Sequence, residues 1–427
     1  MKRVSFGQLF SLNAYWIGLS FMWNSLHVII LPAVLLHLVP DAQKNTYLGL
    51  LTFVGLIIAM LVQPLSGAIS DTWVSRWGRR RPLILWGTLF DFIFLVFLGW
   101  AGGLGWLALG YIGLQFSSNI AHGPMQGLLP DQVPPEQLGW ASGFKNLMDM
   151  AGLVVSSLLV GRLLSPEARH PVGVVGLVAI VLAAGAAVTL LGVREVPSTK
   201  PAAVKPRPVS VLSDAFHIDL KAHRSYAWLI ASRLLFLAGI YGIQTFAQYY
   251  VRDVLAVSNP IQLTGDLLAA ITLTLIVFAL AGGWMGDRVG HRFMSLVASL
   301  VGGLGCLLML WARTPFTLLI FGSILGGGIG LFLTANWALA NELAPSDQAG
   351  KFLGLTNLAT AGAGAIGRLE GPFIDLFNNA HPGAWWGYTG LFLLGMVAIL
   401  ASAWLLKWVV IPKTLSGTSQ AQAVVAR

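Results

Sequence analysis

The chain has 427 residues, of which 56% are hydrophobic and 10% are charged, and its mean hydropathy is +0.75. This composition lies outside the range of soluble globular domains and within that of proteins that cross a membrane many times. The formal net charge is +9, but no stretch interleaves basic and aromatic residues as nucleic-acid-binding surfaces do, so we interpret the excess charge as a membrane-topology signal.

The predicted elements are twelve apolar stretches that recur along the whole chain, each long enough as a helix to cross a hydrocarbon core of roughly 30 Å. They are apolar on all sides and rich in Leu, Ala and Gly, which favours helices over the alternating strands of a β-barrel. We therefore predict an all-α membrane protein with spans near residues 10–38, 46–70, 83–103, 106–128, 140–164, 172–193, 226–251, 262–285, 293–312, 315–340, 351–377 and 385–411.

The positive residues indicate the orientation of these spans. Most of the 26 Lys and Arg residues lie in the two tails and in alternate loops, which predicts that both termini are cytoplasmic. Lys2 and Arg3 precede a first span without a small-residue cleavage site, so we expect this N-terminus to be retained. We expect the protein in the plasma (inner) membrane, and its single cysteine, Cys306, permits no internal disulfide.

The chain divides into two similar halves. The stretch 194–225 holds four prolines among basic residues, and we interpret it as a cytoplasmic linker between a six-helix bundle at 1–193 and a second at 226–411, followed by a cytoplasmic tail at 412–427. The segment DQVPPEQLGWASGFKNL (131–147) aligns with ELAPSDQAGKFLGLTNL (342–358) at an offset of 211 residues. Such a duplication predicts two pseudo-symmetric bundles with a binding site between them near the membrane midplane.

A charged motif occurs once in each half. Its residues in GAISDTWVSRWGRRRP (67–82) are Gly67, Asp71, Gly78, Arg79 and Arg80, and in GWMGDRVGHR (283–292) they are Gly283, Asp287, Gly290 and Arg292, with Arg292 aligned to Arg80. This repeated G-x-x-x-D…G-R-R pattern resembles that of the major facilitator superfamily. The longer spacing of the first copy is similar to that of the plant sucrose–proton symporters and of the glycoside–pentoside–hexuronide cation symporters such as melibiose permease.

The resemblance implies the twelve-helix major facilitator fold and assigns the motif residues to a conformational latch. In the family the aspartate meets the start of the eleventh helix, where partial positive charge stabilises a carboxylate, and the arginines brace neighbouring helix ends. The first copy departs from the family pattern at Thr72, where an arginine is usual, whereas the second copy keeps Arg288. The alternative interpretation is that the arginines only anchor the loop on the cytoplasmic side.

Ionisable residues inside the spans are functional candidates, because a charge in the hydrocarbon core must face protein or water. Asp149 of the fifth span and His27 of the first are the expected proton-coupling residues, although Lys145 lies one turn before Asp149 and could neutralise it as a structural pair. For Arg233 of the seventh span we expect one of three roles. It would bind a substrate hydroxyl or carboxylate, pair with Asp149, or extend to the cytoplasmic surface. We expect Asp91 of the third span to serve helix packing.

The eleventh span contains two further features. Arg368 and Glu370 lie beside Gly371 and Pro372, where a helix can bend, and form either an outer gate or a structural pair. GAGAIG (362–367) fits the dinucleotide-binding pattern G-x-G-x-x-G, but it follows no strand, so we interpret it as helix packing. The sequence contains no phosphate-binding loop, metal-spaced His and Cys set or triad pattern, so we predict no enzyme, no cofactor and no metal site.

Polar and aromatic residues in the spans expected to line the cavity form the candidate substrate site. Amides pair with hydroxyls, and aromatic faces cover the C–H surface of a sugar, although each residue alone is more simply explained as an interhelical contact. The predicted substrate-binding residues are Asn24, His27, Gln115, Asn119, Gln126, Arg233, Gln244, Gln248, Asn336 and Trp337.

These residues and the resemblance lead us to predict a secondary active transporter. It would move a small polar solute such as a sugar or glycoside by alternating access, with symport of a proton or a sodium ion. The glycine-rich G-P-x-x-G-G run of antiporters is absent from the fifth span, which favours uptake. Two alternatives stay open, namely an exporter of a drug-like or lipid-like amphiphile and a non-transporting assembly factor or sensor. The expected partners are the solute, the coupling ion and the lipid bilayer, without nucleic acid, and the family expectation is a monomer.

Overall fold

The computed structural model describes residues 3–195, 223–345 and 348–410, and these residues are almost entirely helical and contain no β-strand. The helices before residue 195 are α1 (Phe6–Asn24), which continues through the π-helical turn Ser25–Ile30 into α2 (Leu31–Leu35), then α3 (Lys44–Thr72), α4 (Arg81–Gly99), α5 (Leu104–Gln132), α6 (Leu138–Leu163) and α7 (Val172–Gly192). The helices after residue 223 are α9 (Arg224–Val254), α10 (Pro260–Val289), α11 (His291–Met309), α12 (Pro315–Leu343), α13 (Ala349–Arg368), α14 (Gly371–Ala380) and α15 (Trp386–Leu405).

The predicted all-α fold with twelve spans is confirmed, with one difference in the eleventh span. Ten stretches within the described residues are long and apolar enough to cross a membrane, and α5 and the α13–α14 pair complete the twelve. The eleventh span is interrupted between Arg368 and Gly371, beside the Gly371 and Pro372 pair where a bend was expected, so the span predicted for 351–377 consists of two helices. Pro372, in the first turn of α14, has no N–H to bond the preceding turn and cannot continue α13 without a break.

The parts of the predicted linker at 196–222, together with Met1, Lys2 and the predicted tail at 412–427, lie outside the described residues. By proximity the chain forms two units, which do not coincide with the predicted halves. Unit 1 comprises Met1–Val211, Gln244–Thr272 and Arg368–Tyr388, and unit 2 comprises Leu212–Ile243, Leu273–Gly367 and Thr389–Arg427.

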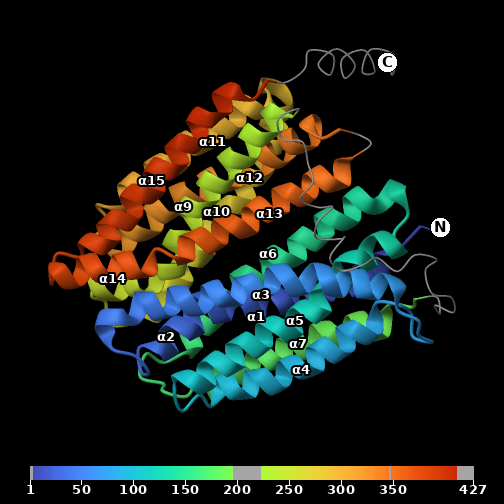
Figure 1. Cartoon of the computed structure of the whole chain (residues 1–427), viewed down its shortest axis with the longest axis horizontal. Helices are drawn as coiled ribbons and strands as arrows, with labels where there is room; N and C mark the ends of the chain where they lie inside the picture. Colours follow the sequence, from blue (N-terminus) through green and yellow to red (C-terminus); the bar gives the residue numbers. More distant parts are fainter. Residues whose placement is uncertain (1–2, 196–222, 346–347, 411–427) are drawn as a thin grey trace. The chain divides into compact units, whose positions relative to one another are not determined.

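Within unit 1, α1 packs against α6 and α7, and α5 packs against α3 and α4 (Figure 1). Large apolar side chains such as Tyr15, Phe21 and Tyr111 are fully buried in this packing. The helices approach closely at glycine: a Cβ at Gly87 of α4 would lie 2.8 Å from the backbone nitrogen of Ala121 in α5. Small residues therefore set the spacing of these helices, as expected where lipid provides no hydrophobic drive between them.

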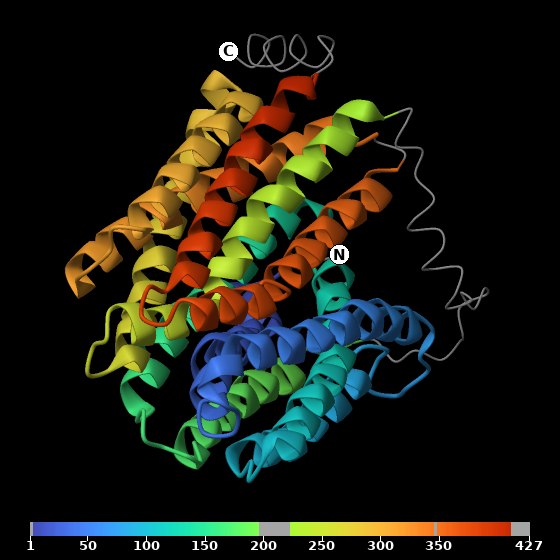
Figure 2. The same ribbon diagram turned by 60° about the vertical axis from the view of Figure 1, so that its left-hand side comes forward.

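Within unit 2, α11 and α12 lie side by side in both views (Figure 1, Figure 2). A Cβ at Gly328 of α12 would lie 2.6 Å from the backbone nitrogen of Gly302 in α11, so these helices also meet at glycines. Near one end of unit 2, Tyr226 packs edge-on against Phe352, and its hydroxyl donates to the Phe352 carbonyl at 2.7 Å. This contact belongs to a buried apolar cluster that also contains Leu229 and Leu339.

The internal repeat predicted from the sequence is present in the backbone. The helices α5 and α12 both have 29 residues, and their ends differ by the same 211 positions as the aligned segments. The hydrogen bonds that close them correspond too, because Val133 donates to Leu129 and Ala344 donates to Ala340. The internal repeat is thus present in this pair of helices, in their length and in the hydrogen bond that closes each of them.

Candidate functional site

A hydrogen-bonded cluster in unit 1 surrounds His27, which lies in the π-helical turn Ser25–Ile30. The His27 Nε2 atom lies 2.9 Å from the Tyr111 hydroxyl, and the imidazole stacks on the Trp23 ring with centroids 5.0 Å apart. A single π-helical turn within an α-helix frequently marks a functional position. The sequence prediction that His27 belongs to a site is consistent with this environment.

Tyr111, Gln115 and Asn119 follow at a four-residue spacing along α5, which places them on one face of the helix. Gln115 Nε2 donates to the Tyr111 hydroxyl at 2.7 Å, and Asn119 Nδ2 donates to the Gln115 carbonyl at 2.7 Å. Gly55 of α3 leaves room for this row, since a Cβ there would lie 2.5 Å from the Tyr111 ring. Sequence analysis missed Tyr111, although its position one helical turn before Gln115 indicates that the two side chains share a face of the helix.

Arg368 and Glu370 lie at the interruption between α13 and α14. The Arg368 charge is near enough to act on His27 and Tyr111, so a cation, an imidazole, a phenol and an amide row are brought together in unit 1. The Glu370 Oε2 atom is buried, and it has no hydrogen-bond partner among the described residues. The predicted function of these two residues as an outer gate or a pair stays a prediction.

Two of the predicted ligand amides join helices of unit 1. Asn24 Nδ2 donates to the hydroxyls of Ser156 and Ser157 in α6, at 2.7 and 2.9 Å. The Gln248 amide nitrogen, in the orientation that satisfies both ends of the amide, donates to two carbonyls of the π-helical turn at 3.0 and 3.1 Å. The other predicted amides of unit 1 differ in burial, with Gln126 exposed and Gln244 half-buried.

Asp149 of α6 lies in a small polar group of unit 1. Its carboxylate accepts a hydrogen bond from the Ser20 hydroxyl and lies 3.5 Å from the Lys145 ammonium. The ammonium also lies 4.0 Å above the Trp16 ring. The pairing of Lys145 with Asp149 is therefore confirmed, whereas the coupling role of Asp149 stays a prediction.

Asp91 of α4 is fully buried, as expected for a residue that serves helix packing. It accepts a hydrogen bond from the Ser117 hydroxyl of α5, so it links two helices of unit 1. One turn earlier, the Thr88 hydroxyl lies 2.6 Å from the Tyr15 hydroxyl of α1. Two polar contacts thus link α4 to α1 and to α5.

Arg233 is the buried cation of unit 2. Its guanidinium donates from Nε to the Thr360 hydroxyl at 2.9 Å and from Nη1 to the Asn336 Oδ1 atom at 2.9 Å. The Trp337 ring lies beside it, 5.6 Å from the Arg233 Cζ atom. Three predicted substrate residues are thus brought together, and extension of Arg233 to the cytoplasmic surface, one of the predicted alternatives, is wrong because the side chain is buried and held by α12 and α13.

The first copy of the charged motif forms a cluster in unit 1, which we call the first charge cluster (Asp71, Arg80 and Asp131). The Arg80 guanidinium lies 2.5 Å from Asp71 and 2.9 Å from Asp131, and Arg79 adds a second pair with Asp131 at 2.6 Å. Gly67 packs opposite Gly123 of α5, which brings the helix ends together. Aspartates and arginines of the predicted motif therefore meet, whereas Asp131 was not predicted as a partner.

Glu195, which sequence analysis also missed, completes the first motif. It accepts from the backbone N–H groups of Arg80 and Arg81 at the start of α4, at 3.1 and 2.9 Å. Gly78 has φ +94°, and a Cβ there would lie 2.3 Å from Glu195. Burial raises the pKa of the Glu195 carboxyl above its ordinary value, and the two backbone hydrogen bonds oppose this rise.

The second copy forms a matching cluster in unit 2, which we call the second charge cluster (Asp287, His291 and Glu342). The His291 imidazole lies 2.5 Å from Glu342 and 3.4 Å from Asp287. Gly290 has φ +94°, the same φ as Gly78.

The contacts correct the alignment of the two motifs by one residue. Arg292 donates to the carbonyls of Leu406 and Lys407 at the end of the last span, as Arg81 donates to Leu190 at the end of α7. The counterpart of Arg292 is therefore Arg81, not Arg80, and the counterpart of Arg80 is His291. Two residues separate Gly78 from Arg81 and one separates Gly290 from Arg292, so the first copy has one residue more in this turn than the sequence alignment assumed.

A second polar network, at the other end of α3, was missed by sequence analysis. Lys44 pairs with Asp253 at 2.7 Å and both side chains are buried. Asp375 of α14 accepts from the backbone N–H of Thr46 at 2.7 Å in the first turn of α3, which satisfies a free donor of the helix end. Asn45 also donates to Asp375, at 2.8 Å. All these residues belong to unit 1.

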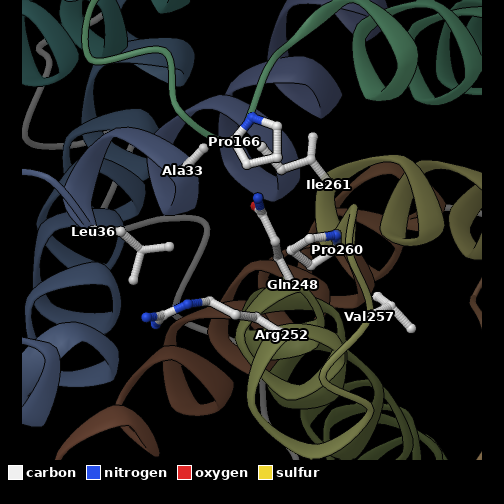
Figure 3. A pocket seen from close by; sticks show the side chains of 8 residues that line it. All are labelled: Ala33, Leu36, Pro166, Gln248, Arg252, Val257, Pro260 and Ile261. Carbon is white, nitrogen blue, oxygen red and sulfur yellow. The ribbon is translucent and has the colours of Figure 1, made fainter.

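Figure 3 shows a pocket of about 250 Å³ in unit 1, and its lining residue Arg252 lies 3.5 Å from Asp253 of this network. Gln248 and Arg252 provide its polar side chains, and Arg252 pairs with Asp41 at 2.5 Å. The remaining lining is apolar and consists of Ala33, Leu36, Pro166, Val257, Pro260 and Ile261.

The family model described as Major Facilitator Superfamily matches residues 4–368 and 261–425. Over 407 residues the chain is 24% identical to Multidrug resistance protein MdtG of Enterobacter lignolyticus, covering 92% of this chain and 90% of that protein, and 23% identical to MdtG of Salmonella typhi, covering 92% and 93%. Its fold is similar to a crystal structure of the nucleoside transporter NupG, with TM-score 0.72, 15% identity and coverage of 94% and 99%. It is also similar to a bacterial homologue of the iron transporter ferroportin in an inward-facing state, with TM-score 0.67, 18% identity and coverage of 94% and 98%.

Proposed function

Starting from the fact that this chain belongs to the Major Facilitator Superfamily and is a multi-pass secondary transporter of small molecules, we propose that it exports drug-like amphiphiles across the inner membrane. Export would proceed by alternating access and be driven by an ion gradient, with both termini cytoplasmic and the monomer as the working unit. The sucrose and glycoside branch that the motif spacing resembles is not the branch of the named relatives, which are multidrug resistance proteins.

The observation that carries this proposal is that four of the predicted ligand amides already donate their hydrogen bonds within the protein. A site for a neutral sugar needs amide donors free for hydroxyl groups. The donors of Asn24, Gln115 and Asn119 instead bond to neighbouring helices or to one another, and that of Gln248 bonds to the π-helical turn. In unit 2 the Trp337 side chain stays exposed, and aromatic surface of this kind suits the apolar part of an amphiphile.

Sugar symport is the second candidate, and the His27 cluster favours it. An imidazole hydrogen-bonded to a phenol and an amide can bind hydroxyl groups and can carry a proton. In either function we assign proton coupling to Asp149, because a carboxylate held by Ser20 and Lys145 can exchange its ammonium partner for a proton. Sodium coupling is the alternative for the same residue.

The test uses the full chain in proteoliposomes with an imposed pH gradient. The probes are the dansyl-tagged undecanoic acid, its primary amide and the corresponding amine, with labelled sucrose and melibiose as the sugar arm and protein-free liposomes for passive movement. We expect gradient-driven movement of at least one dansyl probe and none of the sugars. Sugar uptake without movement of any dansyl probe would support the second candidate, sugar symport. If neither the probes nor the sugars move, the result would support a non-transporting sensor.

The coupling residue is tested in the same vesicles with Asp149→Asn. We expect gradient-driven transport to disappear while exchange of probe between equal pools continues, because binding and alternation remain. Asp266→Asn is the matched control, since Asp266 also pairs with a basic residue, Arg162, at 2.9 Å. Unchanged driven transport in Asp149→Asn would remove Asp149 from the coupling mechanism.

A further inference from the structure

We propose that Arg233 and Asn336 form the subsite that binds the anionic group of the substrate, so that the exported compounds are organic acids with an apolar body. This inference deepens the proposed export function and rests on it. It is carried by three observations in unit 2: a buried cation without an anion, a buried donor without an acceptor and an exposed aromatic ring beside them.

The first observation concerns the charge of Arg233. The side chain is only 5% exposed, yet no salt bridge among the described residues includes it. The ionisable groups that act on it are the phenols of Tyr226 and Tyr241, which are neutral near pH 7. A buried charge that helices keep inside a membrane is costly unless it meets a counter-charge. The neutral Thr360 and Asn336 oxygens position the guanidinium but do not neutralise it.

The second observation concerns the amide of Asn336, which is 0% exposed. Its Oδ1 atom accepts from Arg233, and this contact fixes the orientation of the amide because a reversed amide would set donor against donor. The Nδ2 donor then has no hydrogen-bond partner among the described residues. Buried donors are rarely left unsatisfied in native proteins, so this one points to an acceptor supplied by a ligand.

The third observation concerns the apolar surface beside the two donors. Trp337 follows Asn336 in α12, and its ring lies 5.6 Å from the Arg233 Cζ atom while 37% of the residue stays exposed. The Thr360 hydroxyl is already used, because it donates to the Thr356 carbonyl at 3.1 Å. The geometry therefore offers a guanidinium and an amide N–H for one anionic group and an indole face for the attached apolar body.

The substitution that tests the subsite is Asn336→Asp, which replaces the amide NH2 group by a carboxylate oxygen and keeps the size of the side chain. The new carboxylate would neutralise Arg233 from within and remove the unpaired donor. We expect binding of dansyl-tagged undecanoic acid to weaken by about tenfold or more, because the loss of one hydrogen bond to a charged group raises the Kd by about that factor. Binding of the neutral dansyl amide should change little, and the melting temperature of the protein should rise.

The measurement is the affinity of each dansyl probe for the purified full chain in detergent, read from dansyl fluorescence. Arg233→Lys keeps the charge without the planar fork and should give an intermediate loss for the acid. Arg162→Gln is the matched control, because it removes an arginine that already has a carboxylate partner, Asp266. We expect the control to bind the acid as the wild type does.

Several outcomes would overturn the anionic subsite while leaving export intact. They are equal affinity of the wild type for acid and amide, a preference for the amine, and unchanged acid affinity in Asn336→Asp. If no dansyl probe binds or is transported, the proposed export function is rejected. The subsite is then tested separately by thermal stabilisation with benzoate. Thermal stabilisation of the wild type by benzoate, lost in Asn336→Asp, would retain the subsite, and no stabilisation would reject it as well.

Discussion

The two charge clusters occupy corresponding places in the internal repeat but differ in chemistry. In the first cluster the central residue is Arg80, which is 7% exposed in its side chain and joins Asp71 and Asp131. In the second the central residue is His291, whose partner Asp287 is 76% exposed in its side chain. An arginine stays charged and presents five donors in a fixed fork, whereas a histidine has two ring nitrogens and is charged only when protonated.

This difference in chemistry indicates that the two copies of the motif have different roles. We propose that the first cluster is a permanent brace at the ends of α3, α4 and α5, and that the second is a looser contact that opens at lower cost. The flanking arginines did not diverge in this way, because Arg81 and Arg292 both bind carbonyls at the end of the last helix of their bundle. The flanking arginine contacts are thus shared, whereas the residue between the two acidic partners differs.

The largest effect is expected when the chemistry of the second cluster is introduced into the first. Arg80→His leaves Asp131 and the Ser70 hydroxyl without the guanidinium that joins them, since Arg80 Nη1 lies 2.5 Å from Ser70. Breaking a buried ion pair costs about 3 kcal/mol or more, although the exposure of Asp71 reduces this value. Thermal unfolding of the purified chain should show a clear drop in melting temperature.

The control for this substitution is Arg79→His, because Arg79 also contacts Asp131 but is much more exposed. We expect its cost to stay below about 1 kcal/mol, as for surface ion pairs. Equal losses in the two variants would show that burial of Arg80 does not distinguish the first cluster, and the proposed brace would have no support.

The two motif glycines give the next comparison, because they share φ +94° but differ in surroundings. A side chain at either position is strained by about 1–3 kcal/mol, because L-residues rarely adopt this positive φ. At Gly78 a Cβ would also meet Glu195, whereas at Gly290 nothing lies within 4 Å. Gly78→Ala should therefore lower the melting temperature more than Gly290→Ala. The reverse order would mean that Glu195 moves aside freely and does not hold the start of α4.

A smaller effect is expected when the second cluster is made to resemble the first. His291→Arg places a permanent charge between Asp287 and Glu342, and we expect a gain of about 0.5–1 kcal/mol, typical of a partly exposed pair. His291→Gln keeps a hydrogen-bond donor without the charge and serves as the control. A loss of stability in His291→Arg relative to His291→Gln would show that the space, and not the charge, selects histidine here.

The sequence was sufficient for features that depend on hydropathy or on neighbours along one helix. The twelve spans follow from apolar stretches of sufficient length, and the pair of Lys145 with Asp149 follows from a four-residue helical spacing. The 211-residue repeat was also visible, because prolines and glycines at helix ends keep fixed places in a duplicated chain.

The remaining features depend on residues that meet only in three dimensions. Asp375 and Asn45 are 330 positions apart, so no pattern along the chain joins them. Asn24 serves helix packing because two serines of α6 accept from its amide, and these serines lie more than 130 positions away along the chain. The equivalence of Arg80 and His291 was hidden because the motif copies differ in length by one residue in the turn after the glycine, where only contacts identify the counterpart.

The smallest predicted effect isolates Glu195, for which the second cluster shows no counterpart within 4 Å of a Cβ at Gly290. Burial raises the pKa of the Glu195 carboxyl above its ordinary value of 4.5, so the folded chain holds this proton more tightly than the unfolded chain does. Its contribution to stability is complete below pH 4.5 and is lost as the pH rises through the raised pKa. Glu195→Gln should remove this decline from the melting temperature measured against pH, and a decline of the same size in the variant would assign it to another group.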